Sequence, residues 1–265
     1  MAQRRSALIN VMANAAIRAG RSLTRSFGDI EKLQVSMKGP ADYVSEADHR
    51  SEKILFEDLQ KARPHYGFLM EEAGVVEGTD NSNTWIIDPL DGTMNFLHGI
   101  PHFSISIGLE RDRDLFAGVV YEPITDQMFW AEQGKGAFLN ERRLRVSTRR
   151  DVKECLFSTG IPFAGREGHK SYLAQLENVM AGAAGVRRTG SAALDLAYVA
   201  AGRYDGWWEK GIKPWDIAAG IVLVREAGGV ISDYSGKKEM MKKGEVIAAN
   251  VDVHKPLKRF LDDAA

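Results

Sequence analysis

Two aspartates, Asp88 and Asp91, stand out in the segment WIIDPLDGTMNF at residues 85–96. The apolar, β-branched start of this segment predicts a buried strand that ends at the first acid. Pro89 has no N–H for a strand ladder, so we expect the chain to leave the sheet there. The Leu90 carbonyl would then stand between the two carboxylates as a third hard oxygen. Mg²⁺ prefers such oxygens and commonly shares them with a substrate phosphate.

The next two residues, Gly92 and Thr93, suit the binding of an anion. Glycine lets backbone N–H groups approach a phosphate closely, and the threonine hydroxyl can orient a water molecule. Aspartate pairs at this spacing also occur in ordinary surface turns, where water solvates both carboxylates. The local pattern therefore predicts either a metal and phosphate site or an exposed turn.

The composition is that of an ordinary globular protein. The chain has 265 residues, 44% of them hydrophobic, which is enough for one large domain or two packed halves. A formal charge of −1 argues against direct binding to nucleic acid or to a membrane surface. No run approaches the roughly 18 apolar residues that span a bilayer. The single Cys155 is expected to be a buried structural thiol in a strand, which fits a reducing cytoplasm.

The first half of the chain predicts a helix at residues 6–27 and a short strand at residues 33–37. A second helix should begin where Ser45 and Asp48 form a capping pair. Asp48 would lie in its first turn, where a carboxylate also interacts favourably with the helix dipole. That interaction alone could explain its presence.

Strands dominate the middle of the chain, and the first of them, residues 66–70, ends in Glu71 and Glu72. Strand ends that each deliver carboxylates can converge on one ion, although such a glutamate pair could also be surface decoration. Residues 78–83 are expected to be a polar loop. Alternating apolar and polar residues from Phe103 onward predict a half-buried strand, the first of an antiparallel meander. Its further strands are expected at residues 116–121, 127–132 and 136–146.

A second half begins near residue 151, where a polar run gives a seam without a flexible linker. Ser191 can cap a helix of small residues that Gly202 ends. A strand at residues 204–208 would end in Glu209. Asp216 is, on its own, a good N-cap for a helix that follows it.

These motifs, and the continuation HGIPHFSISIGLE at residues 98–110, closely resemble the inositol monophosphatase family and especially its bacterial members. The resemblance covers nearly the whole chain, with the motifs in their usual order. It implies an α/β (α+β) fold of layered α/β/α/β/α type, the sugar-phosphatase fold, and a homodimer. We therefore expect a single unit over residues 1–265, with a possible seam near 150. Residues 1–150 would then hold a mixed sheet and the metal site, and residues 151–265 a second α/β half.

The resemblance also assigns roles to individual residues. The segment containing Asp48 matches one whose last aspartate lies beside the metals. Glu71 and Thr93 match groups that position and deprotonate the attacking water. The residues that match metal ligands are Glu71, Asp88, Leu90, Asp91 and Asp216. The residues that match substrate contacts are Leu90, Asp91, Gly92, Thr93, Arg187, Glu209 and Asp216. Arg187 and Glu209 could equally be exposed charges.

The implied reaction is hydrolysis of myo-inositol 1-phosphate and related small polyol phosphates. Carboxylates crowded together repel one another unless cations join them, so two or three Mg²⁺ are expected, with Li⁺ inhibitory. Metal ions about 3.5–4 Å apart can bridge a phosphate ester and lower the pKa of a bound water. Direct attack by that water is expected, because no cysteine or histidine nucleophile motif is present. His98 and His102 are expected to be structural.

Other substrates and another function fit the same motifs. Relatives that share the metal motif cleave histidinol phosphate, fructose 1,6-bisphosphate or 3′-phosphoadenosine 5′-phosphate. Some bacterial relatives also contact the transcription machinery. Such a contact between proteins would leave no trace in the net charge, so it stays open as an alternative.

Overall fold

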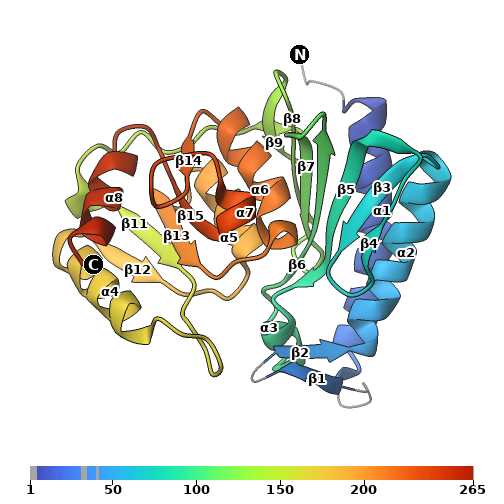
Figure 1. Cartoon of the computed structure of the whole chain (residues 1–265), viewed down its shortest axis with the longest axis horizontal. Helices are drawn as coiled ribbons and strands as arrows, with labels where there is room; N and C mark the ends of the chain where they lie inside the picture. The colour runs from blue at the N-terminus through green and yellow to red at the C-terminus, as the bar shows by residue number, and fades with distance from the viewer. Residues whose placement is uncertain (1–4, 31–34, 40–41, 265) are drawn as a thin grey trace.

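Helix and sheet alternate in five layers through residues 5–30, 35–39 and 42–264, which a computed structural model describes (Figure 1). The longer helices are α1 (Ala7–Phe27), α2 (Glu46–Ala62), α4 (His169–Gly182), α5 (Ala192–Ala200), α6 (Pro214–Glu226) and α8 (His254–Asp262). The pair α1 and α2 covers the outer face of a large sheet, and α5 and α6 lie between this sheet and a smaller one. Helices α4 and α8 cover the far face of the smaller sheet. The layered α/β fold expected from the sequence is confirmed.

The large sheet has the strand order β10-β9-β8-β7-β6-β5-β3-β4. Its strands are β3 (Tyr66–Met70), β4 (Gly74–Val76), β5 (Asp80–Asp91), β6 (Ser104–Arg111), β7 (Asp114–Glu122), β8 (Gln127–Glu132), β9 (Gly136–Leu139) and β10 (Arg142–Arg143). From β5 to β10 the neighbours are antiparallel, which confirms the predicted meander. The pair β3 and β5 is parallel, so the sheet is mixed.

The smaller sheet has the order β12-β11-β13-β15-β14 and belongs to the second half of the chain. Its strands are β11 (Leu156–Thr159), β12 (Gly185–Arg187), β13 (Gly206–Lys210), β14 (Val230–Ser232) and β15 (Glu245–Ala249). Shorter elements are β1 (Val35–Gly39), β2 (Asp42–Ser45), α3 (Thr93–Leu97), α7 (Met240–Lys243) and the 3₁₀ turn at Val152–Glu154. Within the described residues, no helix has the length and apolar character needed to cross a membrane.

Strand β5 is longer at both ends than the sequence predicts. It begins at Asp80, within the expected polar loop, and continues through Pro89 to Asp91. Its pairing with β3 ends at Ile87, but pairing with β6 resumes at Asp91 after a shift in register. The expectation that the chain leaves the sheet at Pro89 was therefore wrong. A proline removes one ladder hydrogen bond, and an irregularity in the pairing accommodates that loss.

Strand β6 is buried on both faces along residues 104–109, rather than half-buried as its alternating pattern predicts. Helix α1 packs on one face of this part of the sheet and α6 on the other. The inward serines are compatible with burial because they find partners. Ser106 Oγ, for example, donates to the Trp215 carbonyl at 3.1 Å.

Other boundaries differ from the prediction by a few residues. The expected strand at 33–37 lies partly outside the described residues, and β1 covers Val35–Gly39. Strand β13 begins later than predicted, so Glu209 pairs with Val246 inside the sheet instead of following the strand. Cys155 is fully buried as expected, but it precedes β11 rather than lying within a strand.

Helix α6 approaches the large sheet closely because glycine and alanine face each other. A Cβ added to Gly118 of β7 would lie 2.5 Å from the Ala219 carbonyl oxygen, and one added to Gly108 would lie 2.7 Å from Ala218 Cβ. Real Cβ atoms do not approach other atoms so closely. Small residues therefore set the distance between helix and sheet, and with it the position of the start of α6.

We predict that Gly118→Ala lowers the free energy of unfolding by about 1–3 kcal/mol, because the new methyl group overpacks the contact with Ala219. Urea denaturation followed by tryptophan fluorescence would measure the change. Gly28→Ala is the matched control, since Gly28 has a φ of −72° and its Cβ would be 3.5 Å from the Arg25 carbonyl oxygen. Equal stability of the two variants would contradict the prediction.

Candidate active site

Glu71 and Asp88 emerge side by side because the strands that carry them are parallel neighbours. Met70 at the end of β3 pairs with Ile87 of β5, and the Glu71 N–H donates to the Ile87 carbonyl at 3.2 Å. The next residue of each strand is therefore an acid at the same place in the sheet. Asp88 is buried, and one of its oxygens accepts the Leu90 N–H at 2.9 Å.

Asp88 has acids around it. Its pKa lies well above the ordinary value, first because it is buried and then because Glu71, Asp91 and Asp216 repel its charge. The four acids predicted to converge are thus brought together. No group of three or more His, Cys, Asp or Glu side chains among the described residues is already arranged as a metal site. Of the four acids, Glu71, Asp91 and Asp216 line a common cavity.

The start of α5 holds Asp91. Its carboxylate accepts hydrogen bonds from the Ser191 hydroxyl and from the N–H groups of Ala193 at 2.9 Å and Ala192 at 3.3 Å. These donors lie at the positive end of the helix dipole. Burial raises the pKa of Asp91 to about 6, and the hydrogen bonds keep it from rising further.

Asp216 comes from the first turn of α6. The sequence analysis expects it to be the N-cap, but α6 begins at Pro214 and Lys213 is the N-cap. The prediction was wrong by one turn because a proline at the first helical position is already suited to a helix start. Asp216 nevertheless accepts the Lys213 N–H, at 2.8 Å. Burial and the charge of Asp91 raise the pKa of Asp216 to about 7.

Asp48 and Thr93 form a pair beside these acids. The capping pair predicted for α2 is present, with Asp48 accepting the Ser45 N–H at 2.8 Å. The other Asp48 oxygen lies 3.1 Å from the Thr93 hydroxyl, which is also 3.0 Å from the Leu90 carbonyl oxygen. This hydroxyl therefore joins the second helix to the turn that carries the aspartates.

Two further residues of α2 hold the same region, and sequence reasoning missed both. Ser51 donates to the Pro89 carbonyl at 2.7 Å. The buried Glu52 accepts the two N–H groups that follow Glu71, at 2.8 and 2.9 Å. Their spacing from Asp48 puts all three on one helical face, which is a signal that the sequence contains.

A cavity of about 290 Å³ opens next to the acids. Acids and two arginines line it, together with the backbone turns at Gly92 and Gly190. Gly92 has a φ of 95°, and a Cβ there would lie 3.1 Å from the His102 carbonyl oxygen. The charged residues that line the cavity are Glu71, Asp91, Arg166, Arg188, Asp195, Glu209 and Asp216.

Two residues predicted to contact substrate, Glu209 and Arg187, differ in their position relative to this cavity. Glu209 lines it, and burial raises the pKa of this carboxyl to about 8. Arg187 is exposed at the end of β12 and is not among the lining residues, whereas the next residue, Arg188, is. Successive side chains of an extended chain point to opposite sides, so two neighbouring arginines are not expected to line the same cavity.

Asp195 is another residue that the sequence analysis missed. It is buried in α5, accepts the Thr189 hydroxyl at 2.7 Å, and its pKa is raised to about 8, mainly by burial. A single acid in the apolar run AALDLA is a visible signal. Neither Cys155 nor His102 is among the residues that line the cavity. Burial raises the pKa of the Cys155 thiol to about 12, and His102 lies 3.9 Å from Glu122.

Comparison with known proteins agrees with the resemblance in the sequence. The model of the inositol monophosphatase family matches residues 4–262. An inositol-1-monophosphatase of Mesorhizobium japonicum is 57% identical, over 96% of this chain and 95% of its own. Nus factor SuhB of Escherichia coli is 41% identical over 94% of each chain. The crystal structure of extragenic suppressor protein suhB from Bartonella henselae has a TM-score of 0.96 and 54% identity, covering 98% of this chain and 100% of that one. The chain therefore belongs to the inositol monophosphatase family.

Proposed function

We propose that this protein is a Mg²⁺-dependent phosphomonoesterase that hydrolyses myo-inositol 1-phosphate and related small polyol phosphates. The observation that carries the proposal is the burial of Asp88 among Glu71, Asp91 and Asp216, beside a cavity that Arg166 and Arg188 also line. Relatives named inositol-1-monophosphatase, at 52–57% identity, support the substrate class.

The donor set fits Mg²⁺. Its members are hard oxygens with an excess of negative charge, which suits an ion that keeps several waters and shares phosphate oxygens. Glu71, Asp88, Asp91, Asp216 and the Leu90 carbonyl would hold two or three ions. When bound, the ions supply charge stabilisation for the phosphate and a more acidic water. Lithium would inhibit by occupying one of these positions.

The protein's own groups would position the reactants. The Thr93 hydroxyl, held by Asp48, would orient the attacking water, and Glu71 would take its proton. The backbone N–H groups of Gly92 and Thr93 would hold phosphate oxygens. Glu209 keeps its proton near neutral pH, since its pKa is about 8, and could donate to a polyol hydroxyl. For the substrate-side arginine we propose Arg188 rather than Arg187, because Arg188 lines the cavity.

A homodimer and a cytoplasmic location also belong to this proposal. The first follows from the family resemblance, and analytical ultracentrifugation would measure it. The second follows from the single, buried Cys155, whose thiol needs no oxidising compartment. Fractionation of the native host would check it.

A second candidate function is a contact with the transcription machinery. It is favoured by relatives named Nus factor SuhB at 41–42% identity. The two functions separate genetically, since a protein contact does not require turnover. Survival of the cellular role in an inactive Asp88→Asn strain would support this second function.

The direct test measures phosphate release from myo-inositol 1-phosphate, histidinol phosphate, fructose 1,6-bisphosphate and 3′-phosphoadenosine 5′-phosphate, with and without Mg²⁺. We expect Mg²⁺-dependent turnover, with the highest kcat/KM for myo-inositol 1-phosphate. Asp88→Asn should lower kcat by about 10³-fold or more, because a metal ligand is lost. Asp112→Asn, in an exposed turn, is the control. Metal-independent turnover, or full activity of Asp88→Asn, would refute the proposal.

In the absence of metal, Asp88→Asn should make the protein more stable, although it lowers activity. Folding raises the pKa of Asp91 to about 6 and of Asp216 to about 7 from the ordinary 3.8. As pH rises, these carboxyls ionise near pH 4 in the unfolded chain but only near pH 6 to 7 in the folded protein. The stability of the metal-free protein therefore falls as pH rises from about 4 to about 7. Asp88→Asn replaces a carboxyl whose pKa is raised by folding with a neutral amide, so it should raise Tm without metal, increasingly across this range.

Differential scanning calorimetry of wild type and Asp88→Asn, with chelator and with Mg²⁺, measures these effects. The difference between the two proteins isolates the site from other acids of the chain. Addition of Mg²⁺ should stabilise wild type more than the variant. A variant that is less stable than wild type in chelator at pH 7 would contradict the argument.

Glu52 is expected to support catalysis by holding Glu71 in position. Glutamine has one acceptor oxygen, and its NH₂ group cannot accept the second backbone N–H after Glu71. We expect Glu52→Gln to lower kcat/KM roughly 10- to 100-fold through misplacement of Glu71, and to raise the Mg²⁺ concentration needed for half-maximal rate. Glu57→Gln, on the exposed side of the same helix, is the matched control. An unchanged Mg²⁺ requirement would argue against this role.

A further inference from the structure

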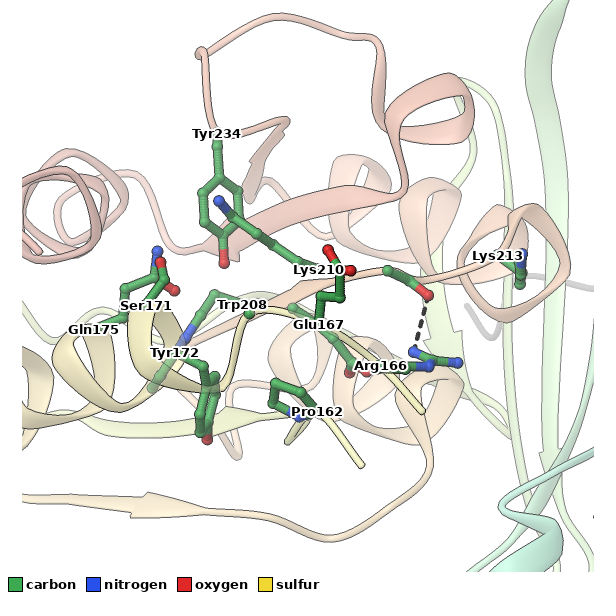
Figure 2. A pocket seen from close by; sticks show the side chains of 14 residues that line it. Pro162, Arg166, Glu167, Ser171, Tyr172, Gln175, Trp208, Lys210, Lys213 and Tyr234 are labelled. Carbon is green, nitrogen blue, oxygen red and sulfur yellow. Dashed lines mark hydrogen bonds between the residues drawn. The ribbon is translucent and has the colours of Figure 1, made fainter. Parts of the chain in front are cut away.

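A second cavity, of about 400 Å³, lies beside the acid-lined one and is called the distal pocket here. It is bounded by the loop at residues 160–168, the start of α4, the end of β13 and Tyr234 (Figure 2). Gly160, Arg166 and Glu209 line both cavities, so the two adjoin. Its volume is that of a site for a small molecule.

The wall of the distal pocket contains hydrogen-bond donors that have no acceptor. Trp208 is fully buried, and neither its Nε1 nor the Tyr234 hydroxyl has a hydrogen-bond partner in the described part of the chain. An indole N–H can only donate. Burial raises the pKa of Tyr234 well above its ordinary value, so the phenol keeps its proton and remains a donor. Buried polar groups are normally paired, and because Trp208 and Tyr234 line a cavity, a ligand or water with acceptor oxygens can complete these two donors.

Three cations, Arg166, Lys210 and Lys213, and two acids, Glu167 and Glu209, line the pocket, and this excess of positive charge favours an anion. The Lys210 ammonium lies 4.3 Å from the centre of the Tyr234 ring, above the pocket in Figure 2. Arg166 is fixed by a 2.9 Å hydrogen bond to the Gly211 carbonyl and by stacking over Phe163. Lys213 contributes a third cation to the lining. Lys210 is also 3.8 Å from Glu245, a pair that leaves the ammonium free to donate elsewhere.

We propose that the distal pocket binds an anionic, oxygen-rich group, a carboxylate or a phosphate, which accepts hydrogen bonds from Trp208 and Tyr234 and faces Lys210. Two sources supply this chemistry. One is a second acidic group on a substrate whose reacting phosphate lies at Asp88, and this source rests on the proposed function. The other is a separate small anion, which requires no catalysis.

Binding is tested by NMR on the ¹⁵N-labelled full chain with Mg²⁺ present, using succinate as the probe. We expect a saturable shift of the Trp208 indole N–H signal, assigned from its loss in Trp208→Phe. Trp85 and Trp207 are internal controls, because their Nε1 atoms are also buried without an acceptor but neither residue lines the pocket. Uncharged myo-inositol should produce no such shift.

Tyr234→Phe removes only the hydroxyl and should weaken succinate binding about ten-fold. The absence of a saturable Trp208 shift would overturn the proposal, and so would equal affinity in Tyr234→Phe. A shift of equal size with myo-inositol would overturn its anionic character. These measurements do not use turnover, so they remain decisive if the phosphatase proposal fails.

Kinetics then distinguish the two sources. If the pocket receives a second group of the substrate, Tyr234→Phe should raise KM for fructose 1,6-bisphosphate about ten-fold and leave KM for myo-inositol 1-phosphate unchanged. If a separate anion binds, neither KM should change while succinate affinity falls. An equal rise in KM for both esters would place Tyr234 in the reacting site and overturn the assignment of a separate pocket.

Discussion

Repulsion between buried carboxylates is the constraint around which this structure is arranged. Asp88 lies among three other acids, and burial makes its charged form costly. Such a cluster persists only if each member is held separately. Asp91 is tied to the start of α5, Asp216 to the backbone of its own helix start, and Asp88 to the Leu90 N–H. The fold thus places like charges together through hydrogen bonds that do not depend on a cation.

The layering explains how distant segments reach one place. The parallel pair β3 and β5 brings Glu71 and Asp88 side by side where the pairing of these strands ends, although the rest of that sheet is antiparallel. Helices α5 and α6 belong to the second half of the chain but pack against the large sheet, with alanine facing glycine at Gly118. Their N-terminal ends therefore meet β5 at the acids. The site therefore depends on the packing of α5 and α6 against the large sheet as much as on its own residues.

Sequence reasoning recovered the elements and the converging acids because local patterns encode them. Capping by Ser45, helical spacing in α1 and strand ends beside Glu71 and Asp88 are all local signals. The errors arose where tertiary contacts decide. Pro89 stays in the sheet because β5 pairs with β6 on both sides of it. Strand β6 is buried on both faces because a helix covers each face. Whether Arg187 or Arg188 lines the cavity depends on which side of the chain faces it, which spacing alone does not give.

Helix α2 contacts the site through one narrow stripe of its surface. Asp48 accepts the Thr93 hydroxyl, Ser51 donates to a backbone carbonyl and Glu52 accepts backbone N–H groups, and the three lie on one face because they are three and four residues apart. Each residue of an α-helix advances about 100° around the axis. Adding or removing a single residue between Asp48 and Glu52 would turn part of this stripe away from its partners. A change in the length of this one turn should therefore disturb the site more than a substitution at most positions on the outer side of the helix.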